Sequence, residues 1–183
     1  MLNQESKKYL EERKVLKGKP IQSLSPVEAR NQFNKNKDAF PLPEIEILSV
    51  ENKEIFINGA DINIRIFSDS NDDNLPLLVN FHGGGWVLGD LDADDKLCRY
   101  LAKKSKHKVV SVDYRLAPEY KFPTPLQDCY KAVCLERHRQ PLRDRYWFDL
   151  SMFLTEILRF HDAPLTDYKA HILRNNLIQN LLH

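Results

Sequence analysis

The chain has 183 residues, which is the size of one ordinary domain with a buried core. Its 27 basic and 26 acidic side chains leave a formal net charge of +1, so the charge balance gives no indication of a nucleic-acid or membrane-surface partner. Its cysteines form no CxxC pair and its apolar stretches fall short of the roughly 20 residues of a membrane span, so we expect free thiols, no metal, no cofactor and a cytoplasmic location.

Residues 1–40 predict two short helices that precede the rest of the domain. Scattered apolar side chains among many charges over residues 4–16 are typical of a surface helix, and a Gly-Lys-Pro sequence closes it. Ser25 followed by Pro26 indicates the N-cap and the first turn of a second helix.

Two segments of strand character follow the helices. Residues 45–59 and 60–69 predict an antiparallel hairpin, because apolar and polar residues alternate and Asn58-Gly59 marks a turn between them. Residues 75–81, LPLLVNF, form a solid apolar run, which indicates a strand covered on both faces.

The order of the next elements is that of an α/β sheet. Residues 92–106 predict a helix, with acids in the first turn and lysines in the last turn, as the helix dipole favours. Residues 107–120 supply a second β-branched run, and another helix is expected near Pro125. A hairpin, a buried strand, a helix and a buried strand open an α/β sheet, so residues 41–133 are predicted to form its core.

The composition changes after about residue 134. All six glycines lie at or before Gly89, and no valine follows Val133. The apolar residues of 134–183 are grouped at helical spacing, so we predict an atypical helical tail rather than further strands. Two origins stay open for this tail: a helical end of the domain, or a different reading frame or piece of coding sequence.

The sequence NFHGGGWVLGD, residues 80–90, places three glycines directly after the buried strand. Glycines let consecutive backbone N–H groups turn toward a ligand without obstruction by side chains. Two such donors can hold the negative oxygen of a tetrahedral acyl-transfer intermediate, which is the function of an oxyanion hole. A tight turn or a phosphate-binding loop is the alternative, but no GxGxxG, GKS or GKT sequence occurs in the chain.

The HGGGW sequence, followed about thirty residues later by VDYRLAPEYKFPTPLQD, resembles the hormone-sensitive-lipase-like family of α/β-hydrolase esterases. The resemblance covers residues 1–133. It implies an α/β fold: an incomplete α/β-hydrolase sheet, made of the hairpin and buried strands, with N-terminal cap helices. The helical C-terminal tail, which the composition predicts, follows this sheet. The implied activity is carboxylic-ester hydrolysis.

The resemblance also implies roles for the residues of the glycine motif. The backbone N–H groups of Gly84 and Gly85 would be the oxyanion donors, and Gly83 would permit the bend of the chain. His82 would organise the loop rather than act as the catalytic base, and Trp86 would line the acyl pocket.

The second motif opens with Asp113, Tyr114 and Arg115, to which the resemblance assigns an architectural role. Asp113 and Arg115 are expected to tie loops together through charge-assisted hydrogen bonds. For Asp113 taken alone, a solvated strand end is the alternative.

The nucleophile, acid and base of this family cannot be assigned from the sequence. The family requires a serine in a GxSxG turn, an acid and a later histidine. No glycine stands where that turn is expected, and we interpret Ser151, within FDLSMF, as a helix serine. Residues 161–176 resemble the segment that carries the acid of the family, but an alanine separates Asp162 from Pro164, and we interpret Asp162 as a helix cap ahead of that proline. No histidine has the setting of the base.

We therefore predict a truncated member of an esterase lineage acting on small acyl esters, inactive on its own. The alternative is a non-catalytic remnant or an interaction protein that binds an acyl compound or a carboxylate. A separately encoded C-terminal fragment is a candidate partner. Strands without their neighbours leave open sheet edges, so we expect poor folding unless the tail covers the exposed apolar face.

Overall fold

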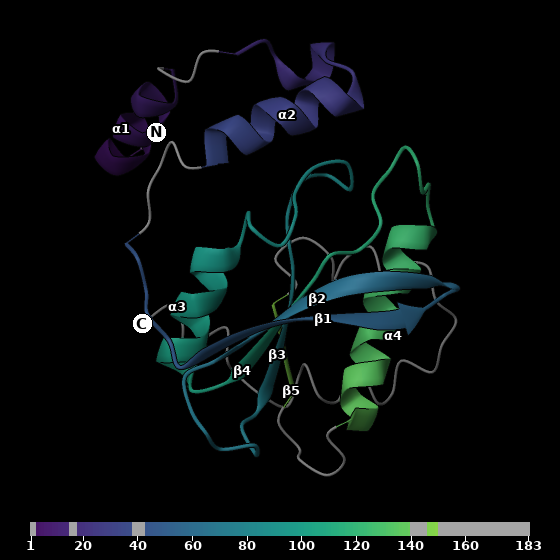
Figure 1. Cartoon of the computed structure of the whole chain (residues 1–183). Helices are drawn as coiled ribbons and strands as arrows, with labels where there is room; N and C mark the ends of the chain where they lie inside the picture. The colour runs from purple at the N-terminus through teal and green to yellow at the C-terminus, as the bar shows by residue number, and fades with distance from the viewer. Residues whose placement is uncertain (1–2, 15–17, 38–42, 140–145, 150–183) are drawn as a thin grey trace. The chain divides into compact units, whose positions relative to one another are not determined.

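The computed structural model describes residues 3–14, 18–37, 43–139 and 146–149, all within one compact unit that spans Met1–Leu150. Figure 1 shows two helices, Asp95–Ser105 (α3) and Thr124–Arg139 (α4), flanking the strands. The elements in chain order are α1 (Gln4–Lys14), the 3-10 turn η1 (Ile21–Ser23), α2 (Pro26–Asn36), β1 (Ser49–Ile57), β2 (Ala60–Ser68), β3 (Leu77–Phe81), α3 (Asp95–Ser105), β4 (Lys108–Val112), α4 (Thr124–Arg139) and β5 (Tyr146–Asp149).

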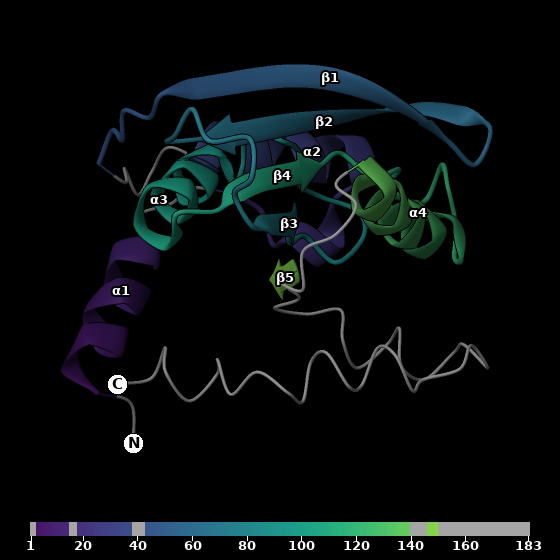
Figure 2. The same cartoon turned by 90° about the horizontal axis from the view of Figure 1, so that it is seen from below.

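The strands form one mixed sheet in the order β1-β2-β4-β3-β5, which Figure 2 shows from one side. The first two strands are the expected antiparallel hairpin, and the left-handed backbone of Asn58 and Gly59 (φ 50° and 75°) is that of a tight hairpin turn. β2 pairs antiparallel with β4, whereas β3 pairs parallel with β4. The parallel pair needs a crossover, and α3 provides it.

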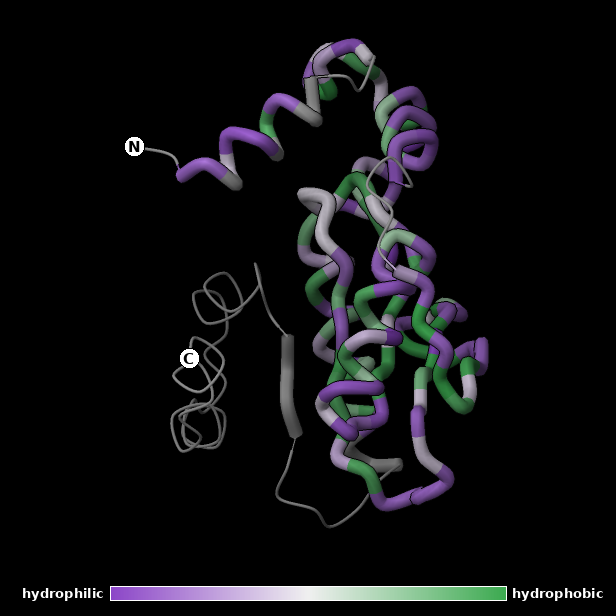
Figure 3. Tube along the Cα trace, turned by 90° about the vertical axis from the view of Figure 1, so that its left-hand side faces the viewer, coloured by the Kyte–Doolittle hydropathy of each residue, from purple (hydrophilic) through white to green (hydrophobic). Residues whose placement is uncertain are grey.

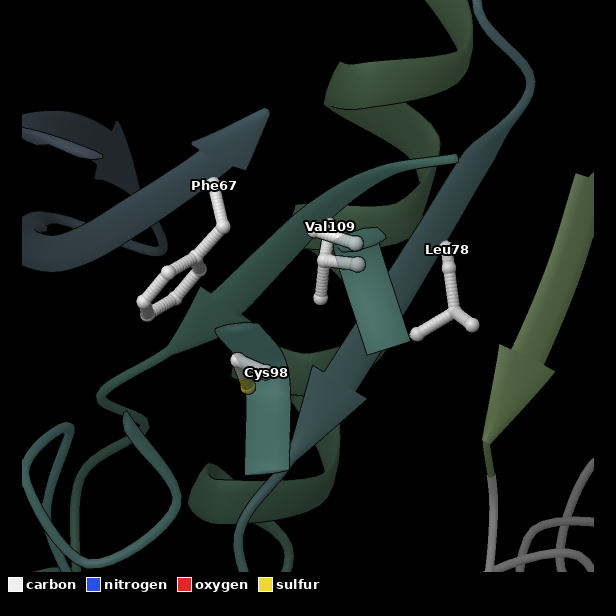
Figure 4. Packing of buried hydrophobic residues seen from close by; sticks show 5 residues of the cluster. Phe67, Leu78, Cys98 and Val109 are labelled. Atoms are coloured by element: carbon white, nitrogen blue, oxygen red, sulfur yellow. The ribbon is translucent and has the colours of Figure 1, made fainter. Parts of the chain in front are cut away.

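The centre of the sheet is buried on both faces, as the solid apolar runs predict. All five residues of β3 are buried, and so are four of the five in β4. On one face Cys98 and Ala102 of α3 pack against Phe67, Leu78 and Val109, which come from three neighbouring strands (Figure 4). In Figure 3 the hydrophobic colour lies mainly on the core elements, whereas the helix next to the N-terminus is mostly hydrophilic.

The two N-terminal helices are confirmed. Ser25 caps α2 in a reciprocal arrangement: the backbone N–H of Glu28 donates to the Ser25 hydroxyl, and the Glu28 carboxylate accepts from the Ser25 backbone N–H at 2.9 Å. Pro26 occupies the first turn, where its missing N–H costs no hydrogen bond. The polar surface of α1 fits the surface helix expected over residues 4–16.

The strand β5 corrects one expectation about the chain after residue 133. It lies in the segment for which we predict helices, and it pairs parallel with β3, so that β5 rather than β3 forms this edge of the sheet. Its sequence, Tyr-Trp-Phe-Asp, is rich in aromatic residues that favour strands, a local signal that the composition of the whole tail obscured. The end of α4, up to Arg139, is helical and crosses residue 133 without a break. Residues 150–183 lie outside the described part of the chain.

Within the described residues, no helix has the length and apolar character that crossing a membrane demands. The same part of the chain contains no group of three or more His, Cys, Asp or Glu side chains arranged to hold a metal ion.

Candidate functional site

The two sequence motifs meet at one edge of the sheet. Phe81, the last residue of β3, is paired with Val112, the last residue of β4. The loops that start at His82 and Asp113 therefore leave the sheet side by side, at the carboxyl ends of two parallel strands. This is the edge at which open α/β sheets bind their ligands.

Aromatic stacking fastens one motif to the other. The His82 ring is fully buried and lies parallel to the Tyr114 ring, with centroids 4.4 Å apart. The Trp86 ring meets the same tyrosine edge-on at 5.8 Å. The Tyr114 hydroxyl donates a hydrogen bond of 2.6 Å to the backbone carbonyl of His82. The structure thus brings together three of the residues that the sequence singles out, His82, Trp86 and Tyr114.

The hydrogen bond of His82 fixes the position of its ring proton. Its Nδ1 lies 3.0 Å from the carbonyl oxygen of Gly83, which can only accept, so the proton is on Nδ1. The other nitrogen, Nε2, is buried and has no hydrogen-bond partner in the described part of the chain. This contact ties the buried ring to the first residue of the glycine run.

The backbone of the glycine run adopts conformations that other residues avoid. Gly84 and Gly85 have φ values of 137° and 62°, and Trp86 follows in the left-handed region at 68°. A Cβ atom on Gly84 would overlap the Leu88 carbonyl group, and one on Gly89 would overlap the His82 ring. The left-handed Trp86 is held by the backbone N–H of Ala117, which donates to its carbonyl oxygen at 2.8 Å.

Hydrogen bonds to the carbonyl groups orient the N–H groups of the glycine run. The Gly83 carbonyl accepts from His82, and the Gly84 carbonyl accepts from the N–H groups of Val87 and Leu88, at 3.3 and 3.0 Å. In a trans peptide unit the carbonyl and the N–H point in opposite directions. The N–H groups of Gly84 and Gly85 therefore point away from these partners.

Neither glycine N–H is engaged within the part of the chain that the structure describes. No hydrogen bond leads from the N–H of Gly84 or Gly85 to another described residue. Gly84 is half-buried and Gly85 is exposed, so both positions reach the surface. Backbone N–H groups of this kind, at positions that reach the surface, can donate to an anionic oxygen.

Arg115 forms a buried ion pair instead of taking part in the glycine loop. Its guanidinium group donates to both oxygens of Asp128, each at 2.7 Å, and the Asp128 side chain is fully buried in α4. Asn58 of the hairpin turn donates to the same carboxylate at 3.1 Å. This network joins the start of the second motif, α4 and the hairpin turn.

Sequence reasoning did not single out Asp128, although it lies within the VDYRLAPEYKFPTPLQD sequence. A carboxylate in a helix normally faces water, and its partner here is 13 residues away. The one available signal was its position on the apolar side of α4, next to the buried Cys129.

Asp113 contacts β2 rather than Arg115. Its backbone N–H donates to the carbonyl of Asn63 at 2.9 Å. Burial raises the pKa of its carboxyl group, and the nearby His82 ring and the Asn63 side chain offset this only in part. The alternative of a freely solvated strand end does not fit this setting.

The raised pKa of Asp113 predicts a pH-dependent effect of the substitution Asp113→Asn. The folded chain holds this proton at a pH at which the unfolded chain has released it, so the charged carboxylate costs stability above its folded pKa. The asparagine variant should melt at a higher temperature than the wild type at pH 7. This gain should vanish below about pH 4, where the carboxyl group is protonated in both states.

Thermal denaturation between pH 3 and pH 8 measures this difference. Asp61→Asn, at an exposed position of β2, is the matched control and should show no gain. A gain for Asp113→Asn that persists at pH 3, or no gain at pH 7, would contradict the assignment.

The chain is similar in sequence to known ester hydrolases. A sequence model of the alpha/beta hydrolase fold matches residues 78–153. An arylesterase of Saccharolobus solfataricus is 38% identical over 96 residues, which are 52% of this chain and 31% of the relative. The carboxylic ester hydrolase LipN of Mycobacterium tuberculosis is 42% identical over 95 residues, or 52% of this chain and 25% of the relative.

Solved structures of ester hydrolases also superimpose on this chain. The thermostable carboxylesterase EstE1, cloned from a metagenomic library, superimposes with a TM-score of 0.61 at 36% identity, over 64% of this chain and 40% of its own. The ester-hydrolase EH1AB1 from the metagenome of Lake Arreo superimposes with a TM-score of 0.72 at 29% identity, over 81% of this chain and 50% of its own. The chain thus spans a quarter to a third of the length of the two curated relatives.

Proposed function

We propose that the chain belongs, through its N-terminal part, to the hormone-sensitive-lipase-like family of α/β-hydrolase esterases. On this premise, it supplies the oxyanion-binding part of a carboxylic ester hydrolase. The observation that carries the proposal is the pair of N–H donors at Gly84 and Gly85 that no described residue engages. Attack on an ester carbonyl places a negative charge on its oxygen. Two fixed donors stabilise that charge more than they stabilise the neutral ester, which lowers the barrier.

We also propose that this chain alone does not hydrolyse esters. Hydrolysis requires a nucleophile that attacks the carbonyl carbon and a base that accepts its proton. His82 cannot be that base, because its protonated Nδ1 is bonded to Gly83 and its Nε2 is buried. Ser151 and Asp162 lie outside the described residues, and our assignment of Ser151 as a helix serine stays a prediction.

Two finer proposals concern the setting of the protein. A separately encoded C-terminal fragment would supply the missing nucleophile and base, with small acyl esters as the substrates. The described thiols, Cys98, Cys129 and Cys134, are free, which favours a reducing compartment such as the cytoplasm.

A binding measurement combined with an activity assay tests the proposed function. In calorimetry, the full chain should bind methyl butylphosphonate, a tetrahedral monoanion that resembles the intermediate of ester hydrolysis. The same preparation should not hydrolyse p-nitrophenyl butanoate. Turnover that is abolished by Ser151→Ala would show that Ser151 is the nucleophile and would overturn the inactivity. A failure to bind the phosphonate would overturn the oxyanion-binding function.

A non-catalytic role is the second candidate function. The accessible donors at Gly84 and Gly85 suit a bound carboxylate as well as a transition state. Equally tight binding of butanoate and of the tetrahedral phosphonate would favour this role, because a site built for hydrolysis prefers the tetrahedral anion.

A further inference from the structure

Arg30 of α2 contacts the glycine loop and the second motif at the same time. Its Nε donates to the backbone carbonyl of Val87 at 2.8 Å, and its Nη2 donates to the carbonyl of Ala117, also at 2.8 Å. The Glu119 carboxylate accepts from Nη1 and Nη2 at 2.8 and 2.6 Å. One guanidinium group therefore joins three segments that are far apart in the sequence.

A continuous line of hydrogen-bonded peptide units leads from Arg30 to Gly85. The Val87 carbonyl that Arg30 contacts belongs to the same peptide unit as the Leu88 N–H. That N–H donates to the Gly84 carbonyl at 3.0 Å, and the Gly84 carbonyl shares its peptide unit with the Gly85 N–H. Because each unit is trans, the dipoles point in the same direction along the line.

Such a line transmits both orientation and polarisation. A cation on the first carbonyl makes the first hydrogen bond charge-assisted, and each further bond in a chain gains strength from the one before it. The last member, the Gly85 N–H, becomes a stronger donor toward an anion. The charge is permanent, because a guanidinium group does not lose its proton in proteins.

We propose that Arg30 is a positioning residue that orients and polarises the Gly85 N–H through the peptide units of Val87–Leu88 and Gly84–Gly85. The proposal rests on the oxyanion-binding function of that N–H. Under this proposal, α2 affects the Gly85 N–H through Arg30, in addition to any contact of the helix with substrate.

A different role for Arg30 would be that of a mechanical link between α2 and the loops. The two roles differ in what Glu119 does. A mechanical link uses the ion pair with Glu119 together with the contacts to the Val87 and Ala117 carbonyls, so Glu119→Gln should weaken it, though less than Arg30→Gln does. The polarised line depends on the cation at the Val87 carbonyl, and Glu119→Gln leaves that cation in place.

Nuclear magnetic resonance on the isotope-labelled full chain tests the proposal without any ligand. In Arg30→Gln, the Gly85 amide proton and the Val87 carbonyl carbon should both move upfield, since both signals report hydrogen-bond strength. In Glu119→Gln both should stay near their wild-type positions, and Arg30→Lys should lie closer to the wild type than Arg30→Gln. Unchanged signals in Arg30→Gln, or equal changes in Glu119→Gln, would overturn the proposal.

Titration with methyl butylphosphonate extends the test to the function. A gain of roughly 10 to 30% per bond along the line predicts an affinity about two- to fivefold weaker in Arg30→Gln and unchanged in Glu119→Gln. If the wild type does not bind the phosphonate while the amide signals respond to Arg30, the proposed function fails and the role of Arg30 stands. If the phosphonate binds equally well to wild type and Arg30→Gln, and the amide signals do not change, the proposed role of Arg30 fails and the proposed function stands. Thermal melts of all variants show whether the fold is kept.

Discussion

Replacing Asp128 with alanine should lower the free energy of unfolding by about 3 to 5 kcal/mol, the cost of breaking a buried ion pair by removal of one partner. The Asp128 carboxylate is fully buried and accepts hydrogen bonds from the Arg115 side chain, from the Arg115 backbone N–H and from Asn58. Its loss leaves the Arg115 guanidinium, 17% exposed, without its counter-charge. Because single domains are stable by about 5 to 15 kcal/mol, this loss threatens the fold itself.

Urea denaturation of wild type and variant measures the change. Lys53→Ala is the control, since its ion pair with Glu51 is about half exposed on both sides and should contribute no more than about 1 kcal/mol. An Asp128→Ala variant as stable as Lys53→Ala would show that the ion pair is not a structural link between the second motif and α4.

A methyl group on Gly84 should abolish most of the anion binding, with an affinity for methyl butylphosphonate about 10- to 150-fold weaker than that of the wild type. This range is the loss of one hydrogen bond to a charged group. Gly84 has φ 137°, and its added Cβ would overlap the backbone of Leu88, whose N–H holds the Gly84 carbonyl. The substitution therefore strains the backbone and displaces the Gly85 N–H that shares this peptide unit.

Gly83→Ala is the matched control in the same run of glycines. An added Cβ at Gly83 meets no atom within 4 Å. This variant should bind the phosphonate nearly as well as the wild type. Equal affinities for Gly84→Ala and the wild type would mean that the anion is held elsewhere, and equal losses in both alanine variants would point to a general effect on the loop.

Local sequence signals were sufficient for most elements of the described fold. The Asn58-Gly59 turn predicted the hairpin, because few residue pairs adopt the left-handed backbone that this turn requires. Ser25 and Pro26 marked the start of α2, and the unbroken apolar run marked β3 as a covered strand. Each of these features depends on neighbours within a few positions, which a sequence displays directly.

The features that sequence reasoning missed depend on residues distant in the chain. Arg30 lies 57 residues from Val87 and 89 from Glu119, so its role follows only from the folded arrangement. Asp128 was missed for the same reason, since its burial depends on a partner in another loop. The strand β5 was missed because its three aromatic residues of strand propensity lie within a segment whose overall composition favours helices.

The most direct test of the oxyanion-binding function observes the two N–H groups while an anion binds. In a titration of the labelled full chain with methyl butylphosphonate, the amide protons of Gly84 and Gly85 should move downfield and saturate at the same ligand concentration. The amide of Gly59, in the hairpin turn, should not move. If the phosphonate binds and shifts the amide signals of other residues but not those of Gly84 and Gly85, the proposed role of the glycine run is contradicted.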